Sequence, residues 1–296
     1  MHQLFTLDIL RWIDDNIGQN IGVSDIVKRS GYSNAQLHRI FKSQVGCSIN
    51  EYVMNKRMQK CAYALKYTNI SIKALSERYH YANPQAFSRY FRSFYGVTPV
   101  DYRQNADLEF QQLFSWKHKN ALELSDCQVD FIHLDDHKFI GLSGNYSFPY
   151  EQAGHSHIPH RAALENEFQI ETQRPAPQLV TLCKPVKKNS SMINFEYHIG
   201  YPNDFAPIPA SFSPLPSVSG DYLKFHFHTN VLHPFEMSSI AYWGFISINN
   251  IKRRDGYDIE YYNFGSTPLD IPYEFTLYIP VIFDTELIDL LLKLRS

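Results

Sequence analysis

Hydrophobic positions in the first hundred residues recur every three or four residues, which is the period of an amphipathic α-helix. Four such positions predict the first helix, namely Leu7, Leu10, Ile13 and Ile17. Ser24 is the expected N-cap of a second helix over residues 25–30, and Gly31 suits the left-handed position after it. Ser33 and Gln36 then form a capping box, so a third helix begins almost at once. This pattern is typical of a helix-turn-helix.

The pattern occurs twice, with the second copy displaced by fifty positions. Residues 33–52 read SNAQLHRIFKSQVGCSINEY, and residues 83–102 read NPQAFSRYFRSFYGVTPVDY. The repeat predicts a duplicated structural unit and therefore two helix-turn-helix motifs in one chain.

The second copy has caps of its own. Ser71 is the predicted N-cap of its leading helix, and Asn83 followed by Pro84 begins the next one. His80 stands where the first copy has Gly31, and histidine tolerates a positive φ angle less well than glycine does. Slight strain is therefore predicted in the second turn.

Each of the two later helices has an apolar stripe and an opposite polar face. The apolar positions are Leu37, Ile40, Phe41 and Val45 in the first copy, and Phe87, Tyr90, Phe91 and Phe94 in the second. The opposite faces hold Ala35, His38, Arg39 and Lys42, then Gln85, Ser88, Arg89 and Arg92. Arg and Gln side chains pair with guanine and adenine edges, whereas Lys and Arg also suit phosphates. The polar faces therefore predict contact with double-stranded DNA.

Two alternatives to DNA contact remain open. The polar faces could be only the solvated sides of amphipathic helices. Arg39 or Arg89 could also form an internal ion pair.

Residues 50–67 contain good helix formers and predict a helix between the two motifs. At 1.5 Å per residue it would span roughly 27 Å. With its flanks it could hold the two recognition helices about 34 Å apart, which is one turn of DNA. One chain could then bind DNA as a monomer.

The charge is divided between the two parts of the chain. Residues 1–105 carry 14 Lys and Arg against 7 Asp and Glu, a net +7, whereas residues 106–296 carry 14 against 23, a net −9. The basic part is the duplicated part, which suits a nucleic-acid binder joined to a domain that does not touch phosphate.

No stretch reaches the roughly 18 apolar residues of a spanning helix, so no membrane contact and a cytoplasmic location are expected. The four cysteines, Cys47, Cys61, Cys127 and Cys183, are widely spaced. They suggest neither a disulfide framework nor a zinc site.

The period changes to two in the second part of the chain. Leu223, Phe225 and Phe227 alternate with polar residues, as in a strand with one buried face. Further strands are predicted over residues 179–184, 192–201, 240–248, 258–263 and 273–281, and helices over residues 162–172, within 232–239 and over 284–296. The second part is therefore expected to be an α+β domain.

Ten of the thirteen histidines follow residue 105, including His155, His157, His160, His226 and His228. A metal or pH sensor is one interpretation, but no cysteine or carboxylate arrangement completes a metal site. No nucleophile elbow, phosphate loop or zinc-protease motif is present, so we expect no enzyme, no metal and no cofactor.

The run FSRYFRSFYGVTPVDYR at residues 87–103 resembles the C-terminal signature of the AraC/XylS family of bacterial transcription regulators. The resemblance implies base contacts from six residues, Ala35, His38, Arg39, Pro84, Gln85 and Arg89. Relatives have tryptophan at the position of Ala35 and glutamine at the positions of His38 and Pro84. The base-reading role is therefore assigned most directly to Arg39, Gln85 and Arg89.

The segment RRDGYDIEYY at residues 253–262 and the later LYIPV resemble the GyrI-like class of effector-binding domains. This resemblance implies a small-molecule site, which relatives use to sense amphipathic or cationic compounds. The effector expected for this chain is a small amphipathic or aromatic compound. Such domains often place a cavity glutamate where this chain has Thr276. The tentative ligand-binding residues are Tyr146, Tyr197, Tyr222, Trp243, Glu260, Glu274 and Thr276.

The expected fold is thus multidomain. An all-α double helix-turn-helix DNA-binding domain (1–106) is followed by a linker (107–127) and an α+β GyrI-like effector-binding domain (128–296). The expected function is a sequence-specific regulator, an activator of stress-tolerance and multidrug-tolerance genes with RNA polymerase as a partner. The alternatives are a ligand-sequestering protein, or a histidine-based metal sensor, whose helical half no longer reads DNA.

Overall fold

The structure is a computed structural model. It describes residues 2–104, 127–152, 158–172, 178–187, 190–202, 208–227, 237–238, 240–246, 251–263 and 274–285, together with Asn249, Leu287 and Ile288. The chain forms two compact units. The first unit holds residues 1–121 with the short segments 148–154 and 187–193, and the second holds the remainder. No helix in the described ranges is long and apolar enough to cross a membrane.

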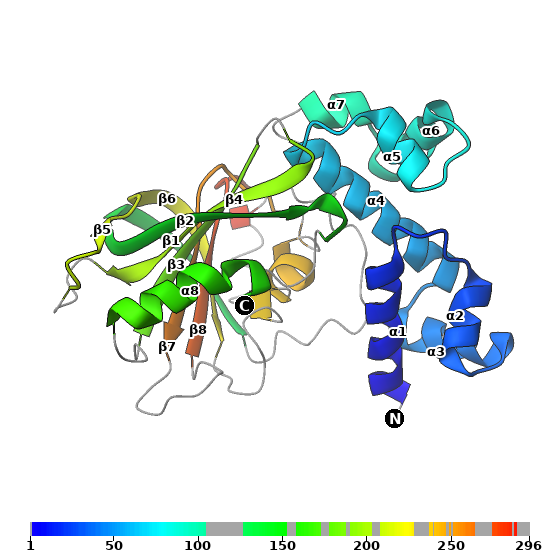
Figure 1. Cartoon of the computed structure of the whole chain (residues 1–296), viewed down its shortest axis with the longest axis horizontal. Coiled ribbons are helices and arrows are strands. Elements are labelled where there is room, and N and C mark those ends of the chain that lie inside the picture. Colours follow the sequence, from blue (N-terminus) through cyan, green and yellow to red (C-terminus); the bar gives the residue numbers. More distant parts are fainter. Residues whose placement is uncertain are drawn as a thin grey trace. The chain divides into compact units, whose positions relative to one another are not determined.

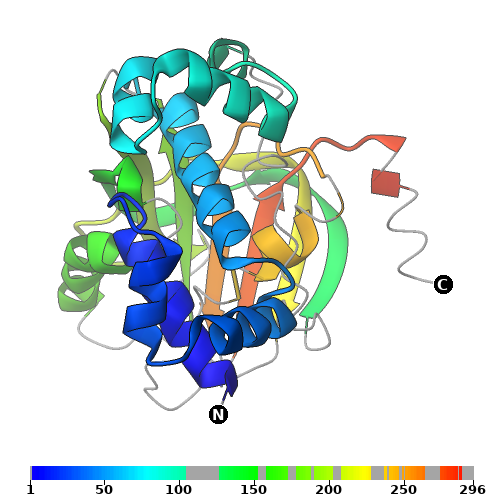
Figure 2. The same ribbon diagram turned by 90° about the vertical axis from the view of Figure 1, so that its right-hand side faces the viewer.

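The first unit is helical. Its helices within residues 2–104 are α1 (His2–Asn16), α2 (Val23–Ser30), α3 (Asn34–Val45), α4 (Ile49–Tyr67), α5 (Ile72–Arg78), α6 (Pro84–Tyr95) and α7 (Pro99–Gln104). Figures 1 and 2 show α1, α2 and α3 at one end of the long helix α4, and α5, α6 and α7 at its other end. The pairs α2–α3 and α5–α6 are the two helix-turn-helix motifs that the repeat predicts.

The caps of the first motif are mostly those expected from sequence. The Gln36 amide donates to Ser33 Oγ at 3.4 Å, and the Ser33 amide donates to Gln36 Oε1 at 3.3 Å. Gly31 ends α2 in the left-handed conformation, with φ of 70°. The predicted start of α2 was wrong, however. Its N-cap is Gly22 and not Ser24, because the carboxylate of Asp25 reaches back to accept the Gly22 amide at 2.9 Å.

The caps of the second motif are confirmed. The Ala74 amide donates to Ser71 Oγ at 3.0 Å, and the Ala86 amide donates to Asn83 Oδ1 at 2.7 Å. His80 has a φ angle of 60°, so it does occupy the left-handed region that glycine fills in the first copy.

The second unit is built on a sheet of antiparallel strands. The described strands are β1 (Cys127–His137), β2 (Phe139–Pro149), β3 (Gln178–Val186), β4 (Met192–Pro202), β5 (Ser213–Pro214), β6 (Val218–Phe227), β7 (Asp258–Asn263) and β8 (Glu274–Pro280). Their order across the sheet is β1-β6-β8-β7-β3-β4-β2-β5. The predicted strands over residues 179–184, 192–201, 258–263 and 273–281 match β3, β4, β7 and β8.

The strand order is symmetric about the central β3–β7 pair. On one side lie β3, β4 and β2, and on the other lie β7, β8 and β6. Helix α8 (Ile158–Thr172) connects β2 to β3, and the π-helix η3 (Ile240–Ile246) lies between β6 and β7 in the same way. Each half also takes its edge strand from the other half, because β1 pairs with β6 and β5 pairs with β2. The second part of the chain is therefore an internally duplicated α+β domain.

The predicted strand over residues 240–248 was wrong, because residues 240–246 form η3. Ala241, Phe245 and Ile246 are buried against the core of β6 and β8. A short continuous apolar run does not distinguish a buried strand from a buried helix. The predicted helix over residues 162–172 is confirmed by α8, whereas the predicted helix within residues 232–239 and the predicted linker lie mostly outside the described residues. Of the predicted C-terminal helix, Leu287 is buried against the same core, and residues 289–296 lie outside the described part.

Candidate functional sites

Helices α3 and α6 each turn one side toward the core and the other toward solvent. Leu37, Phe41 and Val45 are buried in α3, and Phe87, Phe91 and Tyr95 are buried in α6. Ile40, Tyr90 and Phe94, which the apolar stripes included, are half-buried. Six of the predicted DNA-binding residues are exposed, namely Ala35, Arg39, Lys42, Gln85, Arg89 and Arg92. His38, Pro84 and Ser88 are half-buried, and the Ser88 hydroxyl donates to the Pro84 carbonyl at 2.8 Å.

The guanidinium groups of Arg39 and Arg89 are not engaged in ion pairs with any carboxylate of the described residues. The internal ion pair considered from sequence is thus absent in this part of the chain. An exposed, unpaired guanidinium on a recognition helix can donate two parallel hydrogen bonds to a guanine edge or to a phosphate.

Several basic residues of the helical unit face its interior instead. Arg57 of α4 donates to the carbonyls of Gln19 and Ile21 at 3.1 and 3.3 Å. Arg103 of α7 donates to the carbonyls of Leu65 and Ile70. These arginines stabilise the loops that connect the helices. Only part of the positive charge of the helical unit is therefore available to bind DNA. Charge counting could not separate the two groups of arginines.

Lys60, in the middle of α4, is also buried, with 3% of its surface exposed. Burial lowers its pKa to about 7, although nearby acids such as Asp14 oppose that shift. A buried lysine is an unfavourable place for a positive charge.

Glu260 lies at the centre of the helix-covered face of the sheet. In strand register it is directly opposite Thr181 on β3 and Leu277 on β8. Leu277 belongs to the core that η3 covers, whereas Ile199, opposite Thr181, packs with Phe168 of α8. Residues opposite one another in an antiparallel pair share a face, so Glu260 lies between the regions covered by the two helices.

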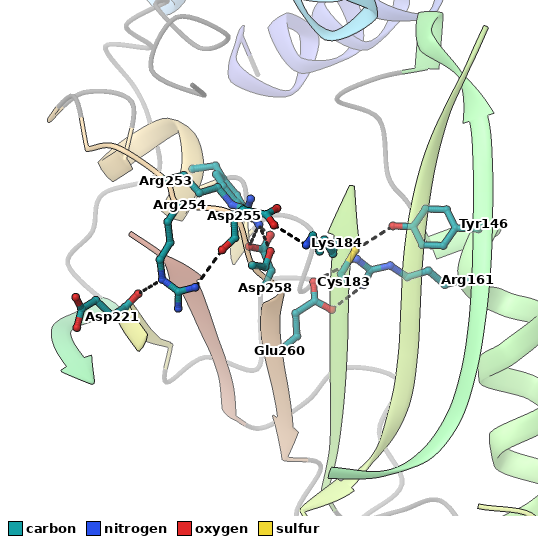
Figure 3. Close-up of polar contacts among 12 residues, drawn as sticks. Tyr146, Arg161, Cys183, Lys184, Asp221, Arg253, Arg254, Asp255, Asp258 and Glu260 are labelled. Carbon is teal, nitrogen blue, oxygen red and sulfur yellow. Dashed lines mark hydrogen bonds and ion pairs between the residues drawn. The ribbon is translucent and has the colours of Figure 1, made fainter. Parts of the chain in front are cut away.

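Both oxygens of the Glu260 carboxylate accept hydrogen bonds. Arg161 of α8 donates to it through both terminal nitrogens, at 2.7 and 3.3 Å, and the Thr181 and Tyr262 hydroxyls each donate at 2.7 Å. Figure 3 shows the Arg161 side chain extending from α8 to Glu260 on β7. Burial alone would raise the pKa of Glu260, but the Arg161 charge and these hydrogen bonds outweigh it and hold the pKa below its usual value.

Aromatic rings surround the Arg161 guanidinium. Its carbon lies 4.8 Å from the centre of the Tyr197 ring and 6.0 Å from that of Tyr146. Tyr146 stacks on Phe195 with ring centres 5.0 Å apart, and its hydroxyl lies 3.2 Å from the Cys183 thiol. We call Glu260, Thr181, Tyr262, Tyr146 and Tyr197 the cation box. Sequence reasoning singled out Glu260, Tyr146 and Tyr197 but missed Arg161, because nothing local to α8 indicates that partner.

Three of the other tentative ligand residues lie on the other face of the sheet. Glu274 and Thr276 alternate with Leu277 on β8 and Tyr222 alternates with Leu223 on β6, so these three residues belong to the opposite face. Thr276 lies 2.7 Å from His226 Nδ1, and Glu274 accepts from the Asn263 amide at 3.0 Å. The Trp243 side chain lies outside the described part. The seven residues therefore do not form one site.

A second buried ion pair lies on the same strand. Asp258 accepts from Arg253 at 2.6 Å and from the Tyr242 hydroxyl of η3. Figure 3 shows Arg253 and Asp258 beside Arg254, which donates to the Asp221 carbonyl at 3.2 Å. This pair fastens the segment before β7 to η3 and to the sheet, so the RRDGYDIEYY motif has a structural role.

His155, His157 and His228 lie outside the described residues, and His160 is near the Tyr146 ring, with ring centres 6.4 Å apart. Among the side chains that the structure describes, no group of three histidine, cysteine or acidic residues is arranged to hold a metal ion.

Known proteins resemble this chain over two different lengths. A helix-turn-helix domain model matches residues 26–105. The multiple antibiotic resistance protein MarA of Escherichia coli is 35% identical over 114 residues, which cover 38% of this chain and 90% of that protein. The transcriptional regulator Rob of Salmonella typhimurium is 24% identical over 282 residues, covering 91% of this chain and 96% of that protein. The right origin-binding protein of Escherichia coli is 24% identical over 286 residues, covering 93% and 96%. The similarity thus spans both compact units.

Proposed function

Because the chain belongs to the AraC/XylS family of helix-turn-helix transcription regulators, which are not enzymes, we propose that one protomer reads two consecutive major-groove segments of double-stranded DNA through α3 and α6. The observation that supports this most strongly is the pair of exposed guanidiniums, Arg39 and Arg89, at matching positions of two capped recognition helices. The two motifs, α2–α3 and α5–α6, lie at opposite ends of the helix α4, so one chain supplies both contacts (Figure 1).

The roles within each helix follow from position and chemistry. Arg39, Gln85 and Arg89 read base edges, with Ala35, His38, Pro84 and Ser88 beside them. Lys42 and Arg92 lie one helical turn further along and bind phosphates. Because the two helices carry different side chains, the site on DNA is asymmetric and not palindromic.

The second unit regulates this binding through a small aromatic or amphipathic effector. Of the two faces that hold the tentative ligand residues, we favour the helix-covered face with the cation box, since that face brings Glu260, Tyr146 and Tyr197 together. The names of the two relatives refer to multiple antibiotic resistance (MarA) and to transcriptional regulation (Rob), which supports drug-tolerance genes as the targets. The family resemblance extends the proposal to activation of stress-tolerance genes, with RNA polymerase as the partner and the bacterial cytoplasm as the location.

The test begins with duplexes selected from a random library by the full-length wild-type chain. Arg89→Ala should lower discrimination at one base pair by about 1–3 kcal/mol, measured by fluorescence anisotropy against single-base variants of the selected duplex. Lys42→Ala should instead weaken all duplexes about equally and reduce the salt dependence of binding by about one charge.

Lys73→Ala is the matched control, because Lys73 is an exposed lysine on α5 and outside both recognition helices. It should leave both quantities nearly unchanged. If Arg89→Ala kept the full sequence preference, the base-reading assignment would fail. Equal wild-type affinity for selected and random duplexes would favour a sequestering protein with a degenerate DNA-binding half.

A further inference from the structure

Two short segments from the later part of the chain belong to the helical unit. Residues 148–154 continue from the end of β2, and residues 187–193 lie between β3 and β4. The first segment contains the single-turn helix η2 (Tyr150–Gln152), which packs against α4. The helical unit therefore includes residues that the helix-turn-helix repeat does not supply.

Both segments contact the chain beside α5, the leading helix of the second motif. Just before α5, the Asn69 amide donates to the Ser190 carbonyl at 3.0 Å. At the last residue of α5, Nε of Arg78 donates to the Glu151 carboxylate at 3.2 Å. The second motif is therefore held by one of these contacts on either side of α5.

The η2 helix lies between α4 and the end of α5. Tyr150 is 4% exposed, although it belongs to a single turn of helix. Burial raises the pKa of its hydroxyl, as do Glu151 and Cys61, whereas the nearby Arg78 charge opposes the shift. Cys61 is a fully buried residue of α4. Tyr150 is thus close both to the long helix α4 and to Arg78 of the second motif.

Arg78 extends this contact to the first motif. A Cβ atom added at Gly18, in the turn that leads to α2, would lie only 2.7 Å from Nη2 of Arg78. The same turn is fixed to α4 by Arg57, which donates to the carbonyls of Gln19 and Ile21. Arg78 therefore bridges the two motifs, and Glu151 of η2 orients it.

A second connection between the motifs matters for DNA because the spacing of DNA segments is strict. One extra base pair moves a segment by about 3.4 Å along the duplex and rotates it by about 35°. Long helices bend gently, so motifs joined only through α4 could adjust to such a change. A bridge beside α4 restricts that bending.

We propose that η2 positions the two motifs, through Tyr150, Glu151 and Arg78, and thereby restricts the chain to DNA segments at one spacing. These three residues contact no base in this scheme. They act through α3 and α6, whose separation they hold. The inference rests on the proposed reading of DNA by both recognition helices.

Duplex spacing tests the proposal on the full-length chain by fluorescence anisotropy. Wild type should bind the selected duplex at least about tenfold more tightly than a duplex with one base pair inserted between the two segments. Glu151→Lys places an ammonium against Arg78 and should reduce this ratio to about threefold or less. Its discrimination at the base pair assigned to Arg89 should remain. Glu77→Lys makes the same charge change at an exposed residue of α5 that pairs with Lys73, and it should keep the wild-type ratio.

A second variant acts on the bridge from the side of the first motif. Gly18→Ala should displace the Arg78 guanidinium, because the added methyl group would lie too close to Nη2. It should also lower the spacing ratio. Gly22→Ala is the control, since its Cβ would meet the nearest atoms at an ordinary 3.8 Å. A wild-type ratio in Glu151→Lys would overturn the proposal. Should that variant fail to fold, a wild-type ratio in Gly18→Ala would overturn it.

The separation of the motifs can also be measured without DNA. Spin labels at Ser43 and Ser93, exposed residues at matching positions of α3 and α6, report it by double electron–electron resonance in a Cys127→Ser background. Glu151→Lys should broaden the distance distribution, and Glu77→Lys should not. Equal widths would contradict the positioning role. A chain that never distinguishes duplex sequences contradicts the DNA-reading function instead, while the label distances still decide whether η2 positions the motifs.

Discussion

At the scale of single residues, buried charges determine how this chain responds to substitution and to pH. Among the residues that the structure describes, the second unit holds two buried ion pairs, Arg161–Glu260 and Arg253–Asp258, whereas the first unit holds Lys60 at 3% exposure. A buried charge is tolerated only when its partners replace the water that it has lost. Substitution of any of these residues should therefore change the free energy of unfolding strongly.

Glu260→Gln is expected to lower the free energy of unfolding by about 3–5 kcal/mol at pH 7, because it leaves Arg161 buried without a countercharge. Urea unfolding measures the change. Glu274→Gln is the matched control, since Glu274 is half-buried and its described hydrogen-bond donor is the neutral Asn263 amide. Its effect should stay below about 1 kcal/mol. A Glu260→Gln effect as small as that of the control would contradict the burial of this pair.

The same pair gives an acid dependence. The pKa of Glu260 is lower in the folded chain than its usual value, so its stabilisation is complete above the unfolded pKa and is lost as pH falls through the folded one. The difference in stability between wild type and Glu260→Gln should therefore shrink below about pH 4.

The buried Lys60 predicts that the stability of the folded chain rises with pH. Its folded pKa is about 7, against about 10.4 in the unfolded chain, so the folded state resists protonation. The penalty is complete below pH 7 and fades as pH rises toward 10. Lys60→Met should raise the free energy of unfolding by about 1 kcal/mol or more at pH 6, and its advantage over wild type should shrink by pH 9.

Chemical denaturation at several pH values, followed by helical circular dichroism, checks this expectation. Lys56→Met is the control. It removes a lysine of the same helix whose ammonium lies 3.0 Å from the Asp14 carboxylate, so it should reduce stability. A constant difference between Lys60→Met and wild type over this pH range would be inconsistent with a buried, titrating lysine.

At the scale of elements, hydrogen bonds within four residues determine where the recognition helices begin. Ser33 with Gln36 and Asn83 with Ala86 satisfy amides that the first turn leaves free. The turns before them both contain a residue with a positive φ angle, Gly31 at 70° and His80 at 60°, but glycine adopts such an angle without steric conflict and histidine does not. The two motifs thus share one architecture but differ in backbone strain.

Reciprocal substitutions should show this difference. His80→Gly is expected to stabilise the chain by about 0.5–1 kcal/mol, because glycine adopts a positive φ angle without steric conflict. Gly31→Ala is expected to destabilise it by about 1 kcal/mol through the backbone alone, since an added Cβ would meet no atom within 4 Å. Thermal unfolding measures both, and shifts of the same sign would contradict the explanation.

At the scale of the whole molecule, duplication shapes both compact units. The helical unit repeats a helix-turn-helix around α4, and the sheet repeats a strand–helix–strand arrangement around the β3–β7 pair. In each unit, the two copies differ at the residues of the candidate functional site. The recognition faces carry different polar residues, and the central strand pair carries the Glu260 carboxylate.

The duplicated helical unit leads to a prediction about stoichiometry. Since both recognition helices belong to one chain, one protomer should saturate a duplex of roughly two helical turns that contains the selected sequence. Native mass spectrometry or sedimentation velocity should give a complex of one protein and one duplex. A minimal site that requires two protomers would refute monomeric recognition.

The sequence alone determined the helix-turn-helix duplication, most of its caps and strands β3, β4, β7 and β8. These features depend on residues within a turn of helix or on alternation along one strand. The wrong predictions have the same cause, because they also rested on local patterns. Ser24 was predicted as the N-cap of α2, but Gly22 with Asp25 caps that helix. The apolar run at 240–248 was compatible with a strand and with a helix, and residues 240–246 form η3. A short sequence pattern does not decide between two secondary structures that fit it equally well.

Only the tertiary structure decided how the tentative ligand residues divide between faces and which basic residues face inward. Arg161 and Glu260 are 99 positions apart, and their contact depends on how α8 packs and on the register of β7 against β3. A shift of one residue in that register would move Glu260 to the opposite face. Sequence supplied the carboxylate and the rings, whereas packing and register brought Arg161 into the box.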